Sequence, residues 1–192
     1  MATSEIVSYH NIRVNRVRDW LTSEEVSFVA FDPVTVQWLT GFTGSNGSIY
    51  LDSEKFVLFT DNRYRLQAPE QLTENNSSAE CKICLEPFTL MAELSKDQPI
   101  VVDGERVSWA QKKRLSAEVT SKVRDTQTPI QKLRSVKDQL EIERITAAAA
   151  IASEALADTL KNLNEFTTEK EMAANLDYKM KLLGASGSAY PP

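Results

Sequence analysis

The sequence predicts an α/β fold built on a mixed sheet. Between residues 11 and 119, short segments rich in β-branched and aromatic residues alternate with segments of helical period, which is the pattern of layered α/β domains. Only the turn Asp52–Lys55 separates the β segments Ser48–Leu51 and Phe56–Thr60, so a hairpin adds an antiparallel pair. After Pro129 the composition becomes helical, with no further β segment.

The spacing of apolar residues places the individual elements of the α/β part. Within Asn11–Leu21 the apolar residues stand near helical spacing with arginines between them, which predicts an amphipathic helix with a solvated basic face. The later elements are expected as a strand at Glu25–Phe31, a short helix at Pro33–Gln37, the hairpin, a helix at Arg63–Leu72, a strand at Cys81–Leu85, a helix at Pro87–Leu94, a strand at Ile100–Val102 and a helix at Ser108–Val119.

The C-terminal part predicts two helices. From Leu133 to Leu163 there is neither Gly nor Pro, and apolar residues recur every three or four positions. This stripe consists of Ile145, Ala149, Ala152, Leu156, Leu160 and Leu163. A second helix is expected to start at the capping box that begins with Thr168 and to stop at Gly184. We therefore expect an α/β domain at residues 1–128 and a helical segment at residues 129–192.

Length, charge and hydropathy exclude several classes of function. The 192 residues suffice for one domain and part of another. A formal net charge of −5 argues against a nucleic-acid surface, and no apolar run is long enough to cross a bilayer. The first twenty residues lack the apolar segment of a secretory signal. We expect a cytoplasmic protein with no nucleic-acid or membrane partner.

A glycine-spaced loop precedes the hairpin. Gly41, Gly44 and Gly47 recur at every third position, which is not the spacing of a dinucleotide or P-loop motif. Both of those motifs lead into a helix whose N-terminus faces the phosphate, whereas this loop leads into a strand. A structural turn is the better interpretation.

The segments that flank this loop and hairpin are WLTGF at Trp38–Phe42 and TDNRY at Thr60–Tyr64. In order and separation they resemble the N-terminal domain of the creatinase, aminopeptidase P and prolidase group. The segment LRSVKDQLEIERITAAAAI resembles the entry to the pita-bread catalytic domain of that group. The matching residues there are Arg134, Lys137, Glu141 and Ile142. The resemblance implies a ribonuclease H-like α/β domain followed by the truncated helical start of a pita-bread α+β domain.

The resemblance also implies an activity, hydrolysis of the Xaa-Pro peptide bond by a water that bridges two divalent metal ions (manganese, cobalt or zinc). Aminopeptidase and dipeptidase activity remain alternatives. The family's Asp, Asp, His, Glu, Glu ligand set lies beyond Pro192, so we expect this chain to bind no metal and to be inactive alone. The group further implies a homo-oligomer, a dimer, in which loops of this domain can lie near the active site of a partner subunit. The substrate-shaping or interface residues would be Trp38, Phe42, Asp61, Arg63 and Tyr64.

Each of these five residues also has a structural interpretation. Asp61 is placed to cap the following helix, or to pair with Arg63 and fix a charge near the domain interface. Tyr64 fits a helix-face anchor with a satisfied hydroxyl. Trp38 and Phe42 fit core packing better than substrate contact.

Two other classes of function remain as alternatives. One is a stand-alone, non-catalytic interaction module, because the resemblance includes a histone-chaperone subunit that uses this fold as a binding platform. The other is a zinc or redox protein built on Cys81 and Cys84. A strand would place these thiols on opposite faces, which favours two independent, partly buried cysteines. His10 lies upstream of the expected first helix, and we expect it on the surface.

Overall fold

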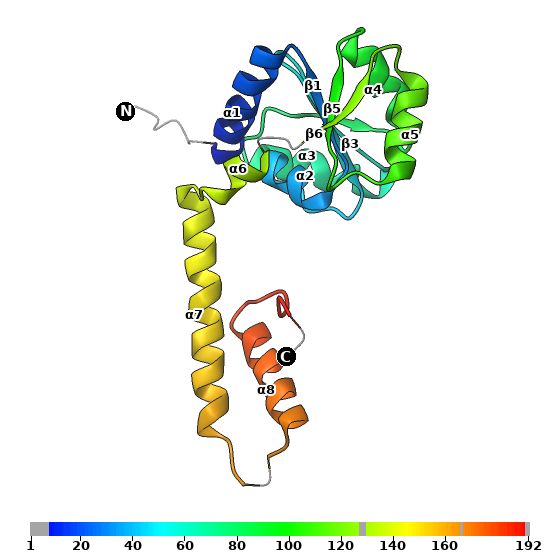
Figure 1. Ribbon diagram of the computed structural model, residues 1–192. Coiled ribbons are helices and arrows are strands. Elements are labelled where there is room, and N and C mark those ends of the chain that lie inside the picture. The colour runs from blue at the N-terminus through cyan, green and yellow to red at the C-terminus, as the bar shows by residue number, and fades with distance from the viewer. Residues whose placement is uncertain (1–7, 127–129, 166, 191–192) are drawn as a thin grey trace, which may run out of the picture. The chain divides into compact units, whose positions relative to one another are not determined.

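The computed structural model describes residues 8–126, 130–165 and 167–190. The chain forms two compact units, Met1–Val136 and Lys137–Pro192, which are described separately below (Figure 1). The boundary expected between residues 128 and 129 falls outside the described residues, so it stays a prediction.

The first unit is built on a six-stranded mixed sheet with the strand order β4-β3-β2-β1-β5-β6. Strand β2 pairs antiparallel with β1 and with β3, while the remaining pairs are parallel. Every strand except β2 therefore runs in the same direction. The strands are β1 (Ser27–Ala30), β2 (Gly47–Leu51), β3 (Phe56–Thr60), β4 (Glu80–Ile83), β5 (Ile100–Asp103) and β6 (Val123–Thr126).

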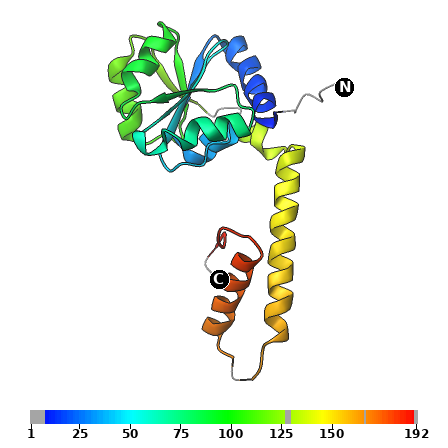
Figure 2. The same cartoon turned by 180° about the vertical axis from the view of Figure 1, so that it is seen from behind.

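Helices cover both faces of this sheet, as Figures 1 and 2 show from opposite sides. One face packs against α1, α2, α3 and α6, and the other against α4 and α5. Because both faces are covered, β1, β2 and β3 read as nearly continuous apolar runs. The helices are α1 (Tyr9–Glu24), α2 (Pro33–Thr40), the 3-10 turn η1 (Asn62–Tyr64), α3 (Gln67–Glu74), α4 (Phe88–Ser95), α5 (Trp109–Glu118) and α6 (Ile130–Ser135).

The predicted fold class is confirmed, and three elements differ from the prediction. Strand β6 (VRDT) was not expected, because its single apolar residue gives no β pattern and its position is set by pairing with β5. The helix expected from Arg63 begins as the 3-10 turn η1, and α3 starts only at Gln67. Helix α6 is a separate element, because Asp138 starts a new helix with its own capping box.

The prediction that His10 is exposed is wrong. Helix α1 begins at Tyr9, capped by Ser8, so His10 lies in its first turn. His10 is buried, with its Nδ1 3.0 Å from the carbonyl oxygen of Trp38. The basic face of α1 is also not fully solvated, because Arg13 is buried, donates to the same carbonyl and stacks over the Trp38 ring at 5.5 Å. Helix α1 packs against α2, and cation–π stacking lets an arginine enter that contact.

The second unit consists of α7 (Gln139–Lys161) and α8 (Glu169–Leu182). The expected capping box at Thr168 is present, with Glu171 as its second member. Among the described residues of this unit, only Ala155 and Thr159 are buried. All members of the predicted stripe of α7 are exposed, from Ile145 to Leu163. The helix pair thus leaves the apolar face of α7 uncovered within the unit.

Candidate functional site at the glycine loop

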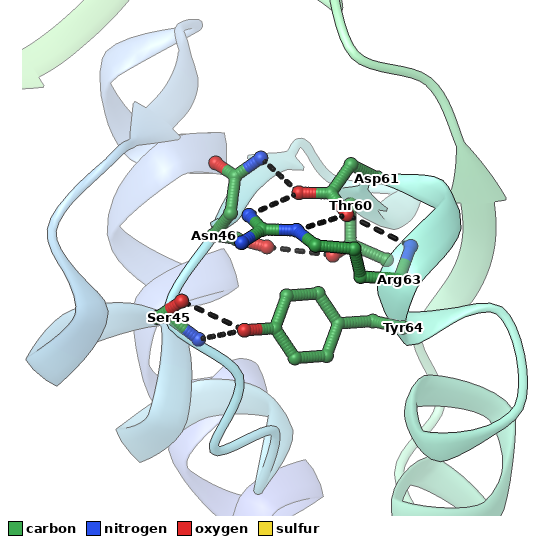
Figure 3. Close-up of polar contacts among 6 residues, drawn as sticks. All are labelled: Ser45, Asn46, Thr60, Asp61, Arg63 and Tyr64. Carbon is green, nitrogen blue, oxygen red and sulfur yellow. Dashed lines mark hydrogen bonds and ion pairs between the residues drawn. The ribbon is translucent and has the colours of Figure 1, made fainter.

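The candidate site lies where the glycine loop meets the exit of β3. Strands β2 and β3 are antiparallel, and Gly47 pairs with Thr60. The loop before β2 and the segment after β3 therefore lie side by side at the same end of these two strands. The Thr60 hydroxyl donates to the carbonyl oxygen of Asn46 at 2.6 Å and fastens the two segments together (Figure 3). The two sequence segments that carry the family resemblance therefore meet in space.

Asp61 is the centre of the polar contacts at this end of β2 and β3. It is buried, and its Oδ1 accepts from the backbone N–H of Arg63 at 2.9 Å, which caps η1 as expected. The Arg63 side chain donates to both carboxylate oxygens, at 3.0 and 2.7 Å. The amide of Asn46 donates to Oδ2 at 2.7 Å (Figure 3). The carboxylate thus holds the turn, the loop and the arginine in one arrangement.

This arrangement stabilises the ionised form of Asp61. Hydrogen bonds from the Arg63 side chain, followed by the bond from Asn46, hold the pKa of the Asp61 carboxyl well below its usual range. The same pair raises the pKa of Arg63. The Arg63 side chain is nevertheless 68% exposed, so one edge of its guanidinium faces solvent.

Tyr64 fastens the loop from a second direction. Its hydroxyl oxygen accepts from the backbone N–H of Ser45 at 3.0 Å and lies 2.7 Å from the Ser45 hydroxyl (Figure 3). These bonds lower the pKa of Tyr64. Its ring meets the Phe42 ring edge-on, with centroids 5.3 Å apart. The expectation of an anchor with a satisfied hydroxyl describes this geometry.

The glycines make room for Phe42, whose ring lies under the loop. A Cβ on Gly44 would come within 2.1 Å of the Phe42 ring, and a Cβ on Gly47 within 3.1 Å. Gly41 ends α2 with a φ of 79°, in the left-handed region that glycine adopts without strain. The glycine spacing therefore serves a close-packed turn, which agrees with the prediction of a structural turn in place of a phosphate site.

Trp38 lies in α2 and has its polar contacts with α1. Its side chain is 8% exposed and belongs to the same core cluster as Phe42. The indole Nε1 is buried and has no hydrogen-bond partner in the described part of the chain.

The structure thus brings Phe42, Asp61, Arg63 and Tyr64 together. Sequence reasoning missed Ser45 and Asn46, which supply the loop's half of the contacts. The available signal was their position between two glycines, where a short polar side chain is placed to hydrogen-bond nearby groups. Their partner could not be read from the sequence, because it lies across the hairpin.

No metal site forms from the described residues: among them, no group of three or more His, Cys, Asp or Glu could hold a metal ion. Cys81 packs on the α3 face of the sheet and Cys84 on the α4 face, so the predicted placement on opposite faces is confirmed. Burial raises the pKa of the Cys81 thiol. In the described residues, no helix is both long and apolar enough to cross a bilayer.

Comparison with known proteins decides the family. The model of the creatinase/prolidase N-terminal domain matches residues 13–136. The chain belongs to this family. Among curated proteins, the chain is similar to an uncharacterized peptidase, YqhT, of Bacillus subtilis, at 28% identity over 163 residues, covering 81% of this chain and 44% of the relative. Human Xaa-Pro aminopeptidase 3 is 34% identical over 76 residues, covering 40% of this chain and 15% of the relative.

The similarity to solved structures covers the second unit as well as the first. An X-Pro aminopeptidase from Thermotoga maritima superposes with a TM-score of 0.79 at 27% identity, covering 92% of this chain and 51% of that one. A Xaa-Pro dipeptidase from Bacillus anthracis shares the fold with a TM-score of 0.82 at 20% identity, covering 94% of this chain and 51% of that one. The chain spans about half the length, or less, of these relatives.

A pH experiment tests the network around Asp61. Because the folded-state pKa of Asp61 is depressed, its contribution to stability is fully present above the unfolded value of about 3.9 and is lost as the pH falls toward the folded value. We expect Asp61→Asn to be less stable than the wild type at pH 7, with the difference shrinking below about pH 4. Urea unfolding of wild type and variant at pH 7 and at about pH 3 measures the two differences in unfolding free energy. Glu24→Gln, at an exposed position, serves as the control. A difference that does not change between the two pH values contradicts the ion-pair account.

Proposed function

We propose that this chain is the N-terminal part of a proline-specific metallopeptidase, a Xaa-Pro aminopeptidase or dipeptidase. The observation that carries the proposal is the match to the Thermotoga maritima X-Pro aminopeptidase, which covers 92% of this chain at 27% identity. That match includes the helical unit as well as the sheet. A similarity limited to the α/β domain would have supported the fold family alone.

In this proposal the chain shapes and assembles an active site that other residues complete. The described residues do not fit a dinuclear centre, so the two divalent ions, manganese, cobalt or zinc, would be held by residues outside this chain. The substrate would be a Xaa-Pro peptide, and the working form a cytoplasmic homodimer. The chain's formal charge of −5 is consistent with the absence of a nucleic-acid partner.

The loop contacts supply the physical basis for a shaping role. Asp61 and Tyr64 hold the glycine loop from two directions, so the loop is presented as a rigid surface. The guanidinium of Arg63 is fixed by Asp61 yet largely exposed, which suits it to contact a carboxylate or a neighbouring subunit. Phe42 supports the loop from below.

A second candidate is a non-catalytic interaction module with the same fold. It is favoured by the uncovered apolar face of α7, where Ile145, Leu156 and Leu160 are exposed, as is Leu163 just after the helix. Such a face is typical of a surface that another polypeptide covers. The peptidase proposal assigns this face to the rest of the enzyme, and the module proposal assigns it to a different protein.

The purified chain gives the first test. We expect it to cleave no Xaa-Pro dipeptide or tripeptide with added manganese, and to retain less than stoichiometric metal after dialysis, because no ligand group forms in the described residues. Elemental analysis and a peptide-cleavage assay measure both, with a complete Xaa-Pro aminopeptidase as positive control. One or two tightly bound metal ions per chain would contradict the proposed division of the enzyme.

A further inference from the structure

Strand β4 forms one edge of the sheet and pairs only with β3 among the described residues. The backbone N–H of Cys84 donates to the carbonyl oxygen of Thr60 at 2.7 Å. Hydrogen-bonding groups alternate between the two sides of a strand, so those of Glu80 and Lys82 also face β3. The N–H and C=O groups of Cys81 and Ile83 therefore point away from the sheet, along its edge.

The side chains of this edge carry charges of both signs. Glu80 and Lys82 share one face of β4, with Oε1 and Nζ 3.7 Å apart, and they are 65% and 37% exposed. Exposed edge strands are templates for pairing with another chain, and a single lysine is a common means of preventing it. Here the lysine stands two residues from a glutamate, so an antiparallel partner could offset both charges.

We propose that two copies of this chain pair antiparallel along β4, about a two-fold axis at Cys81. In this register Cys81 and the partner's Cys81 exchange both backbone hydrogen bonds, because their free groups face the edge. Glu80 then lies opposite the partner's Lys82, and Lys82 opposite the partner's Glu80. Each such cross-strand pair of opposite charge is favourable.

Two other symmetric registers also satisfy free backbone groups of this edge. The register centred on Lys82 pairs Cys81 with the partner's Ile83 and places Lys82 directly opposite the partner's Lys82, which are like charges. The remaining register is centred on Ile83. It places Lys82 opposite the partner's Cys84 and carries Glu80 opposite the partner's Glu86, which brings like charges together. Like charges directly opposite each other are destabilising. The charge pattern of Glu80 and Lys82 therefore selects the register centred on Cys81. The proposed interface does not depend on peptidase activity, because it uses only residues of β4.

Charge exchange on the full chain tests the interface. We expect Glu80→Lys and Lys82→Glu each to raise the dimer dissociation constant about tenfold, because each turns two attractive pairs into two repulsive ones. An equimolar mixture of the two single variants should associate again, since one chain then carries two glutamates and the other two lysines. The double variant E80K/K82E should dimerise as tightly as the wild type. Sedimentation velocity over a concentration series measures the wild type, the two single variants, their mixture and the double variant.

The Glu80 side chain is exposed and that of Lys82 is partly exposed, and neither belongs to a core cluster, so we expect the substitutions to leave the core unchanged. Circular dichroism of each variant checks this. A wild-type chain that stays monomeric at the highest concentration contradicts the proposal. Association that the single charge changes leave unaffected also contradicts it and assigns the contact to another surface, such as the apolar face of α7. The same holds if the mixture of single variants fails to recover the dimer.

Discussion

Replacing Phe42 by alanine is expected to lower the free energy of unfolding of the α/β unit by about 3–5 kcal/mol. The ring is 1% exposed and packs beneath the glycine loop, where Gly44 and Gly47 lack side chains that would occupy the same space. It also meets Tyr64 edge-on. Removal of the ring leaves a cavity and takes away the support on which the loop rests.

Urea unfolding of Phe42→Ala beside Trp109→Ala measures this effect. Trp109 is 78% exposed on α5, so its truncation should change the unfolding free energy by no more than about 0.5 kcal/mol. Equal losses in the two variants would show that the loop is not closely packed on Phe42. Retention of full stability by Phe42→Ala would contradict the role assigned to the glycine spacing.

Backbone amides of α7 and α8 are expected to exchange with deuterium about a thousandfold faster than those of β1, β2 and β3. Among the described residues of the helical unit only Ala155 and Thr159 are buried, and helices without tertiary packing are marginal in water. The capping boxes stabilise the N-terminal ends of α7 and α8, and the ion pair between Asp158 and Lys179 joins the two helices. These interactions bury little apolar surface.

Hydrogen exchange of the full chain, at a concentration where it is monomeric, tests this difference. The amides of β2 serve as an internal reference, because both faces of that strand are covered. If α7 and α8 are as protected as the strands, the apolar face of α7 is covered within the chain. That result would contradict the claim that the apolar face of α7 is uncovered. It would also contradict both functional proposals in their assumption that residues outside this chain cover that face.

The fold class could be predicted because local signals agreed along the chain. The hairpin was predictable since two apolar runs are joined by a short polar turn, and the helix starts at Ser108 and Thr168 because their caps are local in sequence. Strand β6 was missed for the opposite reason. Its order comes from pairing with β5, and no local pattern records that pairing.

The buried polar residues of α1 were equally beyond local reasoning. His10 and Arg13 are buried because α2 presents the carbonyl oxygen and the ring of Trp38 to them. From composition alone, a histidine and an arginine near a chain end are expected in solvent. Only the packing of one helix on another shows where these side chains go.

The candidate site was predicted in part. The motif residues Asp61, Arg63 and Tyr64 lie together at the loop, their functional role stays a prediction, and the capping role of Asp61 followed from its place before a turn. The contacts from Ser45 and Asn46 depend on the register of β2 against β3, which sets the loop beside the motif. Sequence periodicity does not supply that register, so this half of the site emerged only from the structure.

The most direct measurement of the central claim uses the native gene product. It can be captured from its source with an antibody against the α/β unit and assayed on Xaa-Pro dipeptides and tripeptides, with and without a chelator. The account predicts a polypeptide about twice as long as this chain, since the chain covers 51% of the Thermotoga maritima X-Pro aminopeptidase, together with cleavage that the chelator abolishes. A captured product that cleaves no Xaa-Pro bond in the presence of manganese would contradict the peptidase proposal and favour the interaction module.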